Sequence, residues 1–527
     1  MSTNQTIVIV GAGFGGIAAA IHLKDKLGFK DFVILEKSSG VGGTWRENQY
    51  PGCLSDVVIH YYSLSTDLKH DWENLCEFQP NILKYVEGVT DNHSLRHHMV
   101  FSTEVISAEW QEDAQFYTVE TRDTKTGAPK TWKARIIISA HGILHIPRMP
   151  VIPGLENFKG TVMHSARWDK SVDLRGKRVA VIGNGSSGAQ IMSNIPAIEG
   201  IQVTQFYRTR NWHLPGFGRP MSGVMNWALT HVPFLSVLFR WFIFWVFELS
   251  YVIIFRALVP RALLVKLLAA STRSTAPKEY HDILIPSFPV GCRRIIYGST
   301  YFSVLRRPNV GISRSGIASV YSNGVITEDG KNLPFDVIIC ATGFVVDTFP
   351  YGLRGRETTI QEFYASKGGP NAYLGTTIPG FPNFCMLGGP NTSTGYTSVL
   401  FFEECQMQYI GQLIKPILDG TATSFEVTSE ANDAYNDTIQ EGMKHTPFTF
   451  CRSWYRVGGS GKNSSIFPGS AITFWWWCQS VNWRHYKIKG LKAGMSSSQQ
   501  RIWVKDTVFV SSASLLALSA AYAYIRG

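Results

Sequence analysis

Two short glycine-rich segments constrain this chain more than any other feature of its sequence. Each follows an apolar, β-branched run and precedes a helix-like pattern, which is the strand–turn–helix context of a dinucleotide-binding unit. The glycines of the GxGxxG patterns are Gly11, Gly13 and Gly16 in the first segment and Gly183, Gly185 and Gly188 in the second. Because each phosphate-binding loop belongs to its own βαβ unit, the sequence predicts an α/β protein with two Rossmann-like dinucleotide-binding domains.

The residues around the first loop predict an adenine dinucleotide. The three glycines of such a loop permit a tight turn, a close backbone approach to pyrophosphate, and packing of the helix on the strand, and the helix amino terminus faces the phosphates. The next apolar strand, residues 32–36, ends at Glu36. An acid at this distance from the loop is typical of one that binds ribose hydroxyls.

The second loop predicts a different cofactor. The strand that follows it ends at Arg208 and Thr209, where the first unit has its acid. A guanidinium at this position can pair with a 2′-phosphate through two hydrogen bonds, which favours NADP over NAD; the alternative is an exposed arginine at a strand end. We therefore expect one domain to hold a flavin and the other to deliver hydride to it. Residues 335–344 are predicted to be the crossover that returns to the flavin domain.

Composition narrows the class of protein further. The 527 residues fit two or three domains, and 45% hydrophobic with 17% charged residues indicates a large core. A net charge of +11 fits nucleic acid, an anionic membrane surface or a phosphate-bearing cofactor; no nucleic-acid motif is present, so nucleic acid is not expected as a partner. The eight cysteines form no CxxC pair, so neither a metal site nor a redox dithiol is predicted. A disulfide reductase would need such a pair near the first loop, where Cys53 stands alone. With no targeting segment expected before the first strand, we predict reduced thiols and an intracellular protein.

A family resemblance rests on two motifs between and beside the loops. The pattern FxGxxxHxxxW followed by Asp matches the segment FKGTVMHSARWD, at Phe158, Gly160, His164, Trp168 and Asp169. It resembles the fingerprint of type I Baeyer–Villiger monooxygenases, which are class B flavoprotein monooxygenases. The segment GGTWRENQYPGCLSD, from Gly42 to Asp56, resembles a second motif of the same family, and the resemblance extends from about residue 6 to about residue 455. For His164 we favour a structural role, hydrogen-bonded to backbone, over acid–base catalysis.

The resemblance implies FAD and NADPH as cofactors. In the implied reaction NADPH reduces FAD, O2 adds to the flavin, and the resulting 4a-peroxyflavin attacks a ketone and inserts one oxygen beside its carbonyl, giving an ester or lactone. By likeness to the stretch PVGCRRIIYGSTYF, Arg294 is the catalytic cation and Arg293 contacts the 2′-phosphate, while Asp56 pairs with Arg294 and orients it. A surface arginine and a turn-capping aspartate are the alternatives. Further cofactor contacts are expected at Gly43, Thr44, Trp45, Asp56, Tyr62, Val105, Ser186 and Thr209.

Two other functions compete with this interpretation. The same flavin intermediate oxygenates nitrogen, sulfur or carbon in related enzymes, and a catalytically inactive, membrane-tethered binding protein would keep the fold. The Asp56–Arg294 pair and Trp168 favour the ketone reaction, and the intact glycine loops argue against an inactive scaffold. An aromatic-rich insertion suggests a lipophilic substrate such as a long-chain, cyclic or terpenoid-like ketone.

Two apolar segments depart from the family pattern. In the first, residues 219–289, charges recur at Arg240, Glu248 and Arg256; a spacing of eight advances about 80° on a helix and keeps them on one broad side. A buried helical lid over the substrate pocket and an interfacial helix that dips into a bilayer both fit this pattern. The second, residues 506–527, has about 19 uncharged residues between Asp506 and Arg526, which fits either a tail anchor or a packed final helix. The protein is therefore expected to be cytoplasmic or membrane-associated.

These observations give a complete domain prediction. The FAD domain comprises residues 1–149 and 335–505, the NADP domain 150–218 and 290–334, the apolar helical insertion 219–289, and the tail 506–527. The glycine- and serine-rich loop 452–469 is expected to become ordered when NADP binds. The tryptophan cluster 474–483 is expected to pack against the apolar insertion.

Overall fold

The larger domain is built on an eight-stranded sheet. The computed structural model describes residues 3–214, 220–298 and 300–490. The strand order is β19-β4-β5-β6-β1-β2-β3, and β20 pairs with the carboxyl half of β6. The strands are β1 (Thr3–Val10), β2 (Phe32–Leu35), β3 (Met99–Val100), β4 (Thr103–Gln111), β5 (Phe116–Asp123), β6 (Pro129–Ser139), β19 (Gly352–Arg354) and β20 (Phe384–Met386).

Helices cover one face of this sheet and create the main core of the protein. They are α1 (Phe14–Ile21), α2 (Thr44–Glu47), α3 (Gln79–Asn92), α11 (Val399–Leu418), α12 (Ser429–Lys444) and α13 (Ala471–Cys478), with the hairpin β21 (Ser424–Val427) and β22 (Tyr486–Lys489). The short helix α10 (Ile360–Ser366) lies on the opposite face, where Ile360 and Tyr364 are buried. From Ile7 to Val10 the strand β1 is buried on both faces, as the continuous apolar run predicts for a parallel strand. A second apolar cluster fills the opposite face of the sheet.

The smaller domain contains a five-stranded, all-parallel sheet in the order β13-β10-β9-β17-β8. Its strands are β8 (Thr161–His164), β9 (Arg178–Ile182), β10 (Gln202–Phe206), β13 (Val310–Ser313) and β17 (Val337–Cys340), and α4 (Ser186–Asn194) follows β9. Two further elements belong here, the short helix α9 (Tyr301–Val304) and the antiparallel strands β14 (Ile317–Tyr321), β15 (Gly324–Thr327) and β16 (Asn332–Pro334). The expected α/β class with two Rossmann-like domains is confirmed.

One domain boundary was predicted wrongly. Residues 335–344 were expected to return to the first domain, but β17 pairs with both β8 and β9 inside the second sheet. The four residues of β17 are all buried, and the central position in the sheet accounts for their uniformly apolar character. The chain leaves the second domain only after β17.

The two chain crossings between the domains lie side by side. β7 (Ile146–Pro147) leads into the second domain, β18 (Phe344–Val345) leads back, and the two strands pair antiparallel. The amide of Arg148 also donates to the carbonyl oxygen of Gly343 at 2.8 Å. One antiparallel pair of strands therefore carries the chain from the first sheet to the second and back.

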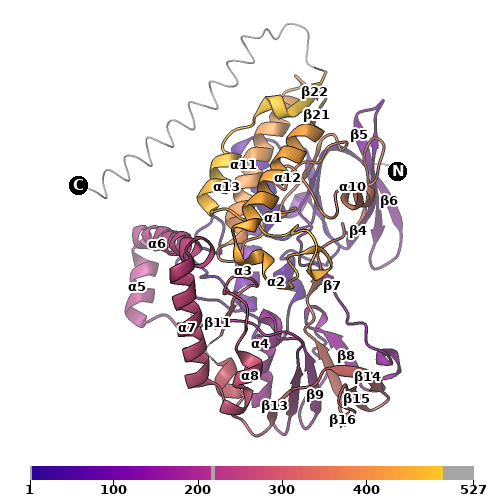
Figure 1. The fold of residues 1–527 in the computed structure, drawn as a ribbon. Helices are drawn as coiled ribbons and strands as arrows, with labels where there is room; N and C mark the ends of the chain where they lie inside the picture. The colour runs from indigo at the N-terminus through magenta and orange to yellow at the C-terminus, as the bar shows by residue number, and fades with distance from the viewer. Residues whose placement is uncertain (1–2, 215–219, 299, 491–527) are drawn as a thin grey trace, which may run out of the picture.

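The insertion into the second domain is helical, as predicted. It comprises α5 (Gly223–His231), α6 (Pro233–Tyr251), the π-helical turn η6 (Val252–Arg256), α7 (Leu258–Thr275) and α8 (His281–Leu284). In Figure 1, α5 and α6 lie at the left edge of the molecule and α7 runs along the smaller domain. The segment Pro233–Arg256 is long and apolar enough to cross a membrane, yet only 28% of its most apolar window is buried. A wholly buried lid is therefore ruled out for this segment, because most of its apolar surface faces outward.

The tryptophan cluster packs differently from the prediction. Phe474 of α13 stacks on Phe402 of α11 with ring centroids 4.5 Å apart, and Trp477 contacts Tyr435 of α12. Phe474 is thus buried in the core of the first domain and Trp477 packs at its edge, because one face of α13 lies on α11 and α12, whereas Trp476 is exposed. The prediction that they pack against the insertion is wrong; the expected apolar tail, residues 506–527, lies outside the described residues.

Candidate active site

The first glycine loop has the geometry of a phosphate-binding turn. A Cβ atom at Gly16 would lie 1.9 Å from the carbonyl oxygen of Gly11, so only glycine permits α1 to approach the loop. The helix begins at Phe14 after Gly13 with no side-chain cap and no acid in its first turn. Its free amide groups therefore suit a phosphate. Glu36, at the end of β2, is buried and accepts hydrogen bonds from the amides of Ala12 and Ser38, each at 2.7 Å.

The second loop repeats this arrangement. A Cβ atom at Gly188 would lie 2.5 Å from the carbonyl oxygen of Gly183, while one at Gly185 would meet nothing within 4 Å. The helix α4 begins at Ser186 without a side-chain cap or an acid in its first turn. Both loops can therefore receive a pyrophosphate, and the chain has the two dinucleotide sites that its sequence predicts.

The other residues expected at the first cofactor lie around α2. Gly43 precedes this helix and faces Gly13, and Thr44 is exposed at its start. Trp45 donates its indole N–H to the hydroxyl of Tyr62 at 3.3 Å, and their rings meet edge to face at 5.8 Å. These residues form a continuous wall that begins at the first glycine loop.

Val105 occupies a less direct position. It lies in β4 with its side chain buried in the core, and the amide of Thr103, at the start of this strand, donates to the carbonyl oxygen of Glu36 at 2.8 Å. The start of β4 is thus adjacent to Glu36, at the end of β2. A contact from Val105 to the cofactor would run through its backbone, and this contact stays a prediction.

Two arginines lie together beside the second loop. Arg208 is exposed just beyond β10, and Arg293 comes from the distant segment after the insertion. Burial and then the charge of Arg208 lower the pKa of Arg293, which places the two guanidinium groups within electrostatic reach of each other. Arg293 is held by its Nε, which donates to the carbonyl oxygen of Arg452 at 2.7 Å. The carbonyl oxygen of Thr209 accepts a hydrogen bond from Asn184 of the loop at 2.7 Å.

Asp56 and Arg294 form the ion pair that the sequence predicts. Nε and Nη2 of Arg294 donate to Oδ2 and Oδ1 of Asp56, each at 2.7 Å, and Nη1 donates to the carbonyl oxygen of Thr394 at 3.1 Å. Burial alone would raise the pKa of Asp56, but Arg294 and a hydrogen bond from Ser186 bring it below its ordinary value. The pKa of Arg294 is raised by the same pairing, against the opposing effect of its burial. The guanidinium is therefore a fixed cation held on three sides.

Two groups in this region were missed by sequence reasoning. The hydroxyl of Tyr455 is buried with no hydrogen-bond partner among the described residues, and the charges of Arg294, Asp56 and Arg293 all act on it. Glu403, the fifth residue of α11, lies 3.4 Å from where a Cβ at Gly15 would stand. Burial, followed by the neighbouring charge of Glu404, raises its pKa to about 7. Neither residue belongs to a recognisable motif, because each reaches the site through long-range packing.

The insertion supplies an apolar wall beside Arg294. A Cβ atom at Gly291 would meet Ile254 and Phe255 of η6 at 2.7 and 2.8 Å. Phe255 also stacks on Phe448 with centroids 4.8 Å apart, and both rings lie against Gly395, the neighbour of Thr394. The π-helical turn thus directs two large apolar side chains toward the segments that hold the guanidinium.

A disulfide joins the same two segments. Cys292, directly before the arginine doublet, is bonded to Cys451, and their Cα atoms are 6.1 Å apart. The expectation that all thiols are reduced is wrong for this pair. Their separation of 159 residues explains why spacing within the sequence could not reveal the bond. The other six cysteines are free and buried.

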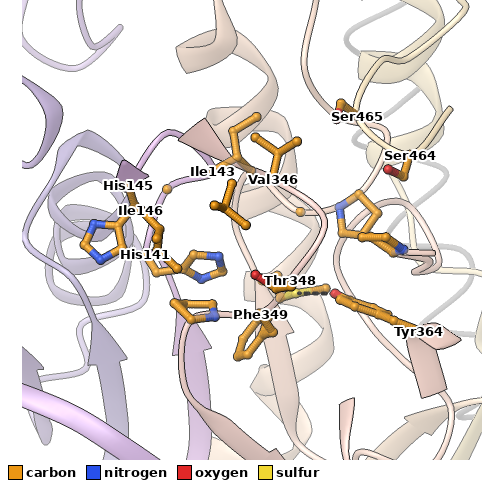
Figure 2. A pocket seen from close by; sticks show the side chains of 18 residues that line it. His141, Ile143, His145, Ile146, Val346, Thr348, Phe349, Tyr364, Ser464 and Ser465 are labelled. Carbon is orange, nitrogen blue, oxygen red and sulfur yellow. Dashed lines mark hydrogen bonds between the residues drawn. The ribbon is translucent and has the colours of Figure 1, made fainter. Parts of the chain in front are cut away.

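A small cavity lies where the paired crossings meet the first domain. Figure 2 shows His141, His145 and Ile146 on one side and Tyr364, Ser464 and Ser465 on the other. Its volume of about 40 Å³ suits a water molecule rather than an organic substrate. Burial lowers the pKa of His141 to about 3 and of His145 to about 4, so both rings are neutral near pH 7.

His164 lies at the end of β8, inside the second sheet. Its Nδ1 accepts a hydrogen bond from the amide of Ala166 at 3.1 Å, and its ring meets Phe344 of the return crossing at 5.8 Å. The predicted backbone hydrogen bond is present. Within the described residues, no group of three His, Cys, Asp or Glu side chains could hold a metal ion.

Comparisons with known proteins agree with this geometry. A family model described as pyridine nucleotide-disulphide oxidoreductase matches residues 8–217. A Baeyer–Villiger monooxygenase of Streptomyces coelicolor is 35% identical over 494 residues, covering 92% of each chain. Cyclohexanone monooxygenase from Rhodococcus sp. Phi1, solved with NADP+, shares 27% identity and a TM-score of 0.82, and OTEMO, solved with FAD and NADP, shares 25% and 0.81. In both comparisons the match covers 93% of this chain and 100% of the solved one.

The fold and the two dinucleotide loops define a flavoprotein monooxygenase of class B. Within that class the chain belongs to the Baeyer–Villiger monooxygenase family. The resemblance inferred from the FxGxxxHxxxW pattern is thereby confirmed.

Proposed function

We propose that this enzyme uses FAD and NADPH to insert one oxygen atom of O2 beside the carbonyl of an apolar ketone, forming an ester or lactone. The observation that carries the proposal is the doubly hydrogen-bonded Asp56–Arg294 pair between the two dinucleotide loops. Structural relatives solved with FAD and with NADP support the cofactor assignment.

The chain offers a complete set of contacts for both cofactors. FAD would bind at the first loop, with Glu36 on its ribose and the wall from Gly43 to Tyr62 beside it. NADPH would bind at the second loop, with Arg208 and Arg293 on its 2′-phosphate; two like-charged groups held close together are best stabilised by a shared anion. Bound FAD, once reduced by NADPH, supplies the activated oxygen.

Arg294 has the properties of an electrostatic catalyst. Asp56 and the carbonyl oxygen of Thr394 fix its orientation before any substrate arrives. A preorganised cation in a partly buried site stabilises negative charge that develops on oxygen, with little reorganisation at the moment of reaction. Its raised pKa keeps it charged throughout the working pH range. Asp56 is a positioning residue, since it acts through the guanidinium.

The apolar wall indicates the class of ketone. Phe255 and Phe448 are both almost completely buried beside the segments that carry Arg294. Such a wall favours an apolar substrate and excludes water from a reactive oxygen species. The long apolar insertion that contributes Phe255 is therefore a specificity element of the site.

The test compares product formed with NADPH consumed. Purified holoenzyme would be given linear 2-ketones and cyclic ketones, with ester or lactone and hydrogen peroxide both quantified. We expect Arg294→Ala to lose product formation by about 100-fold or more while NADPH oxidation continues into hydrogen peroxide; Arg294→Lys should recover only part. Arg314→Ala, at an exposed pair with Asp282, is the matched control.

Two results would contradict the proposal. If wild type and Arg294→Ala formed the same amount of product per NADPH consumed, the guanidinium would have no role in catalysis. If the wild type converted amines or sulfides but no ketone, the reaction would be oxygenation of a heteroatom instead.

A further inference from the structure

The insertion exposes an apolar surface, which we call the apolar face. It consists of the exposed apolar side chains of α5, α6, η6 and α7: Val224, Trp227, Val232, Phe234, Leu235, Leu238, Trp241, Phe242, Trp245, Val246, Leu249, Val252, Leu258, Val259, Leu263 and Leu267. Trp241, Phe242 and Trp245 are 51%, 62% and 53% exposed. This many exposed apolar side chains on consecutive helices mark an interaction site.

The polar side chains of α6 face the protein instead of the solvent. Nη1 of Arg240 donates to the carbonyl oxygens of His60 and Ser63 at 2.9 and 3.1 Å. Glu248 is buried and accepts hydrogen bonds from the hydroxyl of Tyr396 and the amide of Ala471. The usual order of an amphipathic surface helix is therefore inverted: charge is turned inward and aromatic surface outward.

This inversion excludes α6 as a membrane span. A span would be surrounded by lipid and by other spanning helices, whereas Arg240 and Glu248 fasten one side of α6 to the first domain. The helix can present only its outer side to a bilayer. It would therefore lie in the plane of the interface, where tryptophan is the preferred apolar residue.

The charge around the apolar face specifies the sign of the bilayer. Residues 221–277 include five arginines and lysines but a single acid, Glu248, and that acid is buried. Arg256, Lys266 and Arg273 are all exposed on the same elements. Basic side chains on the same insertion as exposed aromatic residues are complementary to anionic lipid headgroups.

The remaining sequence points to the same occupant. The described chain ends at residue 490, and the sequence continues with 37 residues that include 19 uncharged positions, 507–525. A weak apolar anchor becomes stable when a second attachment is added to it. The apolar face and this carboxyl-terminal segment together provide two such attachments.

We propose that the apolar face docks this protein on an anionic phospholipid bilayer, with α6 parallel to the surface. Arg256, Lys266 and Arg273 contact the headgroups, and Trp241 and Trp245 enter the boundary between headgroups and acyl chains. This docking does not depend on which substrate the site oxidises, and its test has no catalytic readout.

The experiment is vesicle co-sedimentation of the full-length holoenzyme. Vesicles of phosphatidylcholine alone are compared with vesicles that also contain phosphatidylglycerol, at low and high salt. The variant Trp241→Gln/Trp245→Gln is compared with Met149→Gln/Val151→Gln, a matched pair of exposed apolar positions outside the apolar face. Leu515→Asp/Leu518→Asp tests the carboxyl-terminal segment separately. Retained flavin absorbance and thermal midpoint verify folding, and Val246→Asn/Leu249→Asn replaces the tryptophan variant if that protein does not fold.

We expect salt-sensitive binding of the wild type to anionic vesicles, and a loss of about tenfold or more in the tryptophan variant but not in its matched control. Three results would overturn the proposal. In the first, the wild type binds neither kind of vesicle. In the second, the tryptophan variant binds as tightly as the wild type, which would assign the attachment to the carboxyl-terminal segment alone. In the third, the wild type forms a dimer that the tryptophan variant disrupts and binds no vesicle, which would make the apolar face a dimer interface.

Discussion

The hydroxyl of Tyr396 donates to the carboxylate of Glu248 at 2.9 Å, and the amide of Ala471 donates to the same oxygen at 3.1 Å. This buried junction ties the last turn of α6 to the segment next to Thr394, whose carbonyl oxygen accepts a hydrogen bond from Arg294. The insertion and the candidate catalytic cation thus share one structural support.

Loss of the Tyr396 hydroxyl should weaken that support. We expect Tyr396→Phe to lower the free energy of unfolding by about 1–3 kcal/mol, because a buried acceptor loses a partner. The double variant Glu248→Leu/Tyr396→Phe should lose less stability than the sum of the losses of the two single variants, since both changes remove the same interaction. Chemical denaturation measures both effects, and additive losses would show that the two side chains act independently.

Arg208 and Arg293 should determine the choice of nicotinamide cofactor. Replacing either with glutamine removes a charged donor to the 2′-phosphate, so KM for NADPH should rise roughly 10- to 100-fold. KM for NADH, which has no such phosphate, should change little. Arg210→Gln, exposed two residues beyond Arg208, is the control. Equal weakening toward both cofactors would show that the arginines support the fold and not the phosphate.

The disulfide should be visible by thiol counting. Labelling of the denatured, unreduced protein should modify six cysteines, and labelling after reduction should modify all eight. We expect Cys451→Ser to lower stability by about 2–4 kcal/mol, because the bond closes a long loop. Cys292→Ser should have the same effect and the double variant no more; eight labelled thiols before reduction would mean that the bond does not form.

Glu403 should make stability depend on pH. Its pKa is raised from 4.5 to about 7 by burial, so the folded state prefers the protonated form. Stability from this group is complete below pH 4.5 and declines as pH rises toward 7, by an upper limit of roughly 3 kcal/mol. Glu403→Gln should therefore become more stable relative to wild type across this range, as thermal midpoints between pH 5 and 8 would show. The thermal midpoint of the control Glu430→Gln, at an exposed position, should vary with pH as that of the wild type does. If the midpoint of Glu403→Gln also varied in parallel with the wild type, the Glu403 carboxylate would lie in a polar environment.

The loop 452–469 should respond to NADP. It already folds back on itself, with Nε of Arg456 donating to the carbonyl oxygen of Gly461 at 2.8 Å, and Arg452 in it contacts Arg293. If Arg293 binds the 2′-phosphate, NADP+ should protect this loop from limited proteolysis, whereas NAD+ should protect it less. If cleavage of the loop were the same with and without NADP+, the loop would not respond to the cofactor.

Local steric rules made the glycine loops and the Rossmann folds predictable. Gly16 and Gly188 are required by backbone contacts only a few residues away, so their meaning is contained in a short stretch of sequence. The pairing of Asp56 with Arg294, 238 residues apart, was predicted from the family resemblance. Local propensities could not have predicted a contact between residues so far apart in the sequence.

Other features depended on tertiary packing that short patterns do not encode. β17 is as apolar as a strand of either sheet would be, so its sequence alone could not assign it to one domain. The packing of Phe474 in α13 on α11, and the bond between Cys292 and Cys451, depend on the overall course of the chain. The amphipathic pattern of α6 gave the common side of Arg240 and Glu248 correctly, but a helical pattern cannot say whether that side faces solvent or protein.

The pairing of β7 with β18 limits how the two domains can move. Since the only strands that pass between the two main sheets within the described chain form one narrow ribbon at Ile146 and Val345, a change in domain orientation must twist or bend that ribbon. The Cys292–Cys451 disulfide ties the segment that carries Arg294 to the first domain at a second point. Any change in the orientation of the two domains must therefore leave both this bond and the ribbon intact, so their relative movement is restrained at two places along the chain.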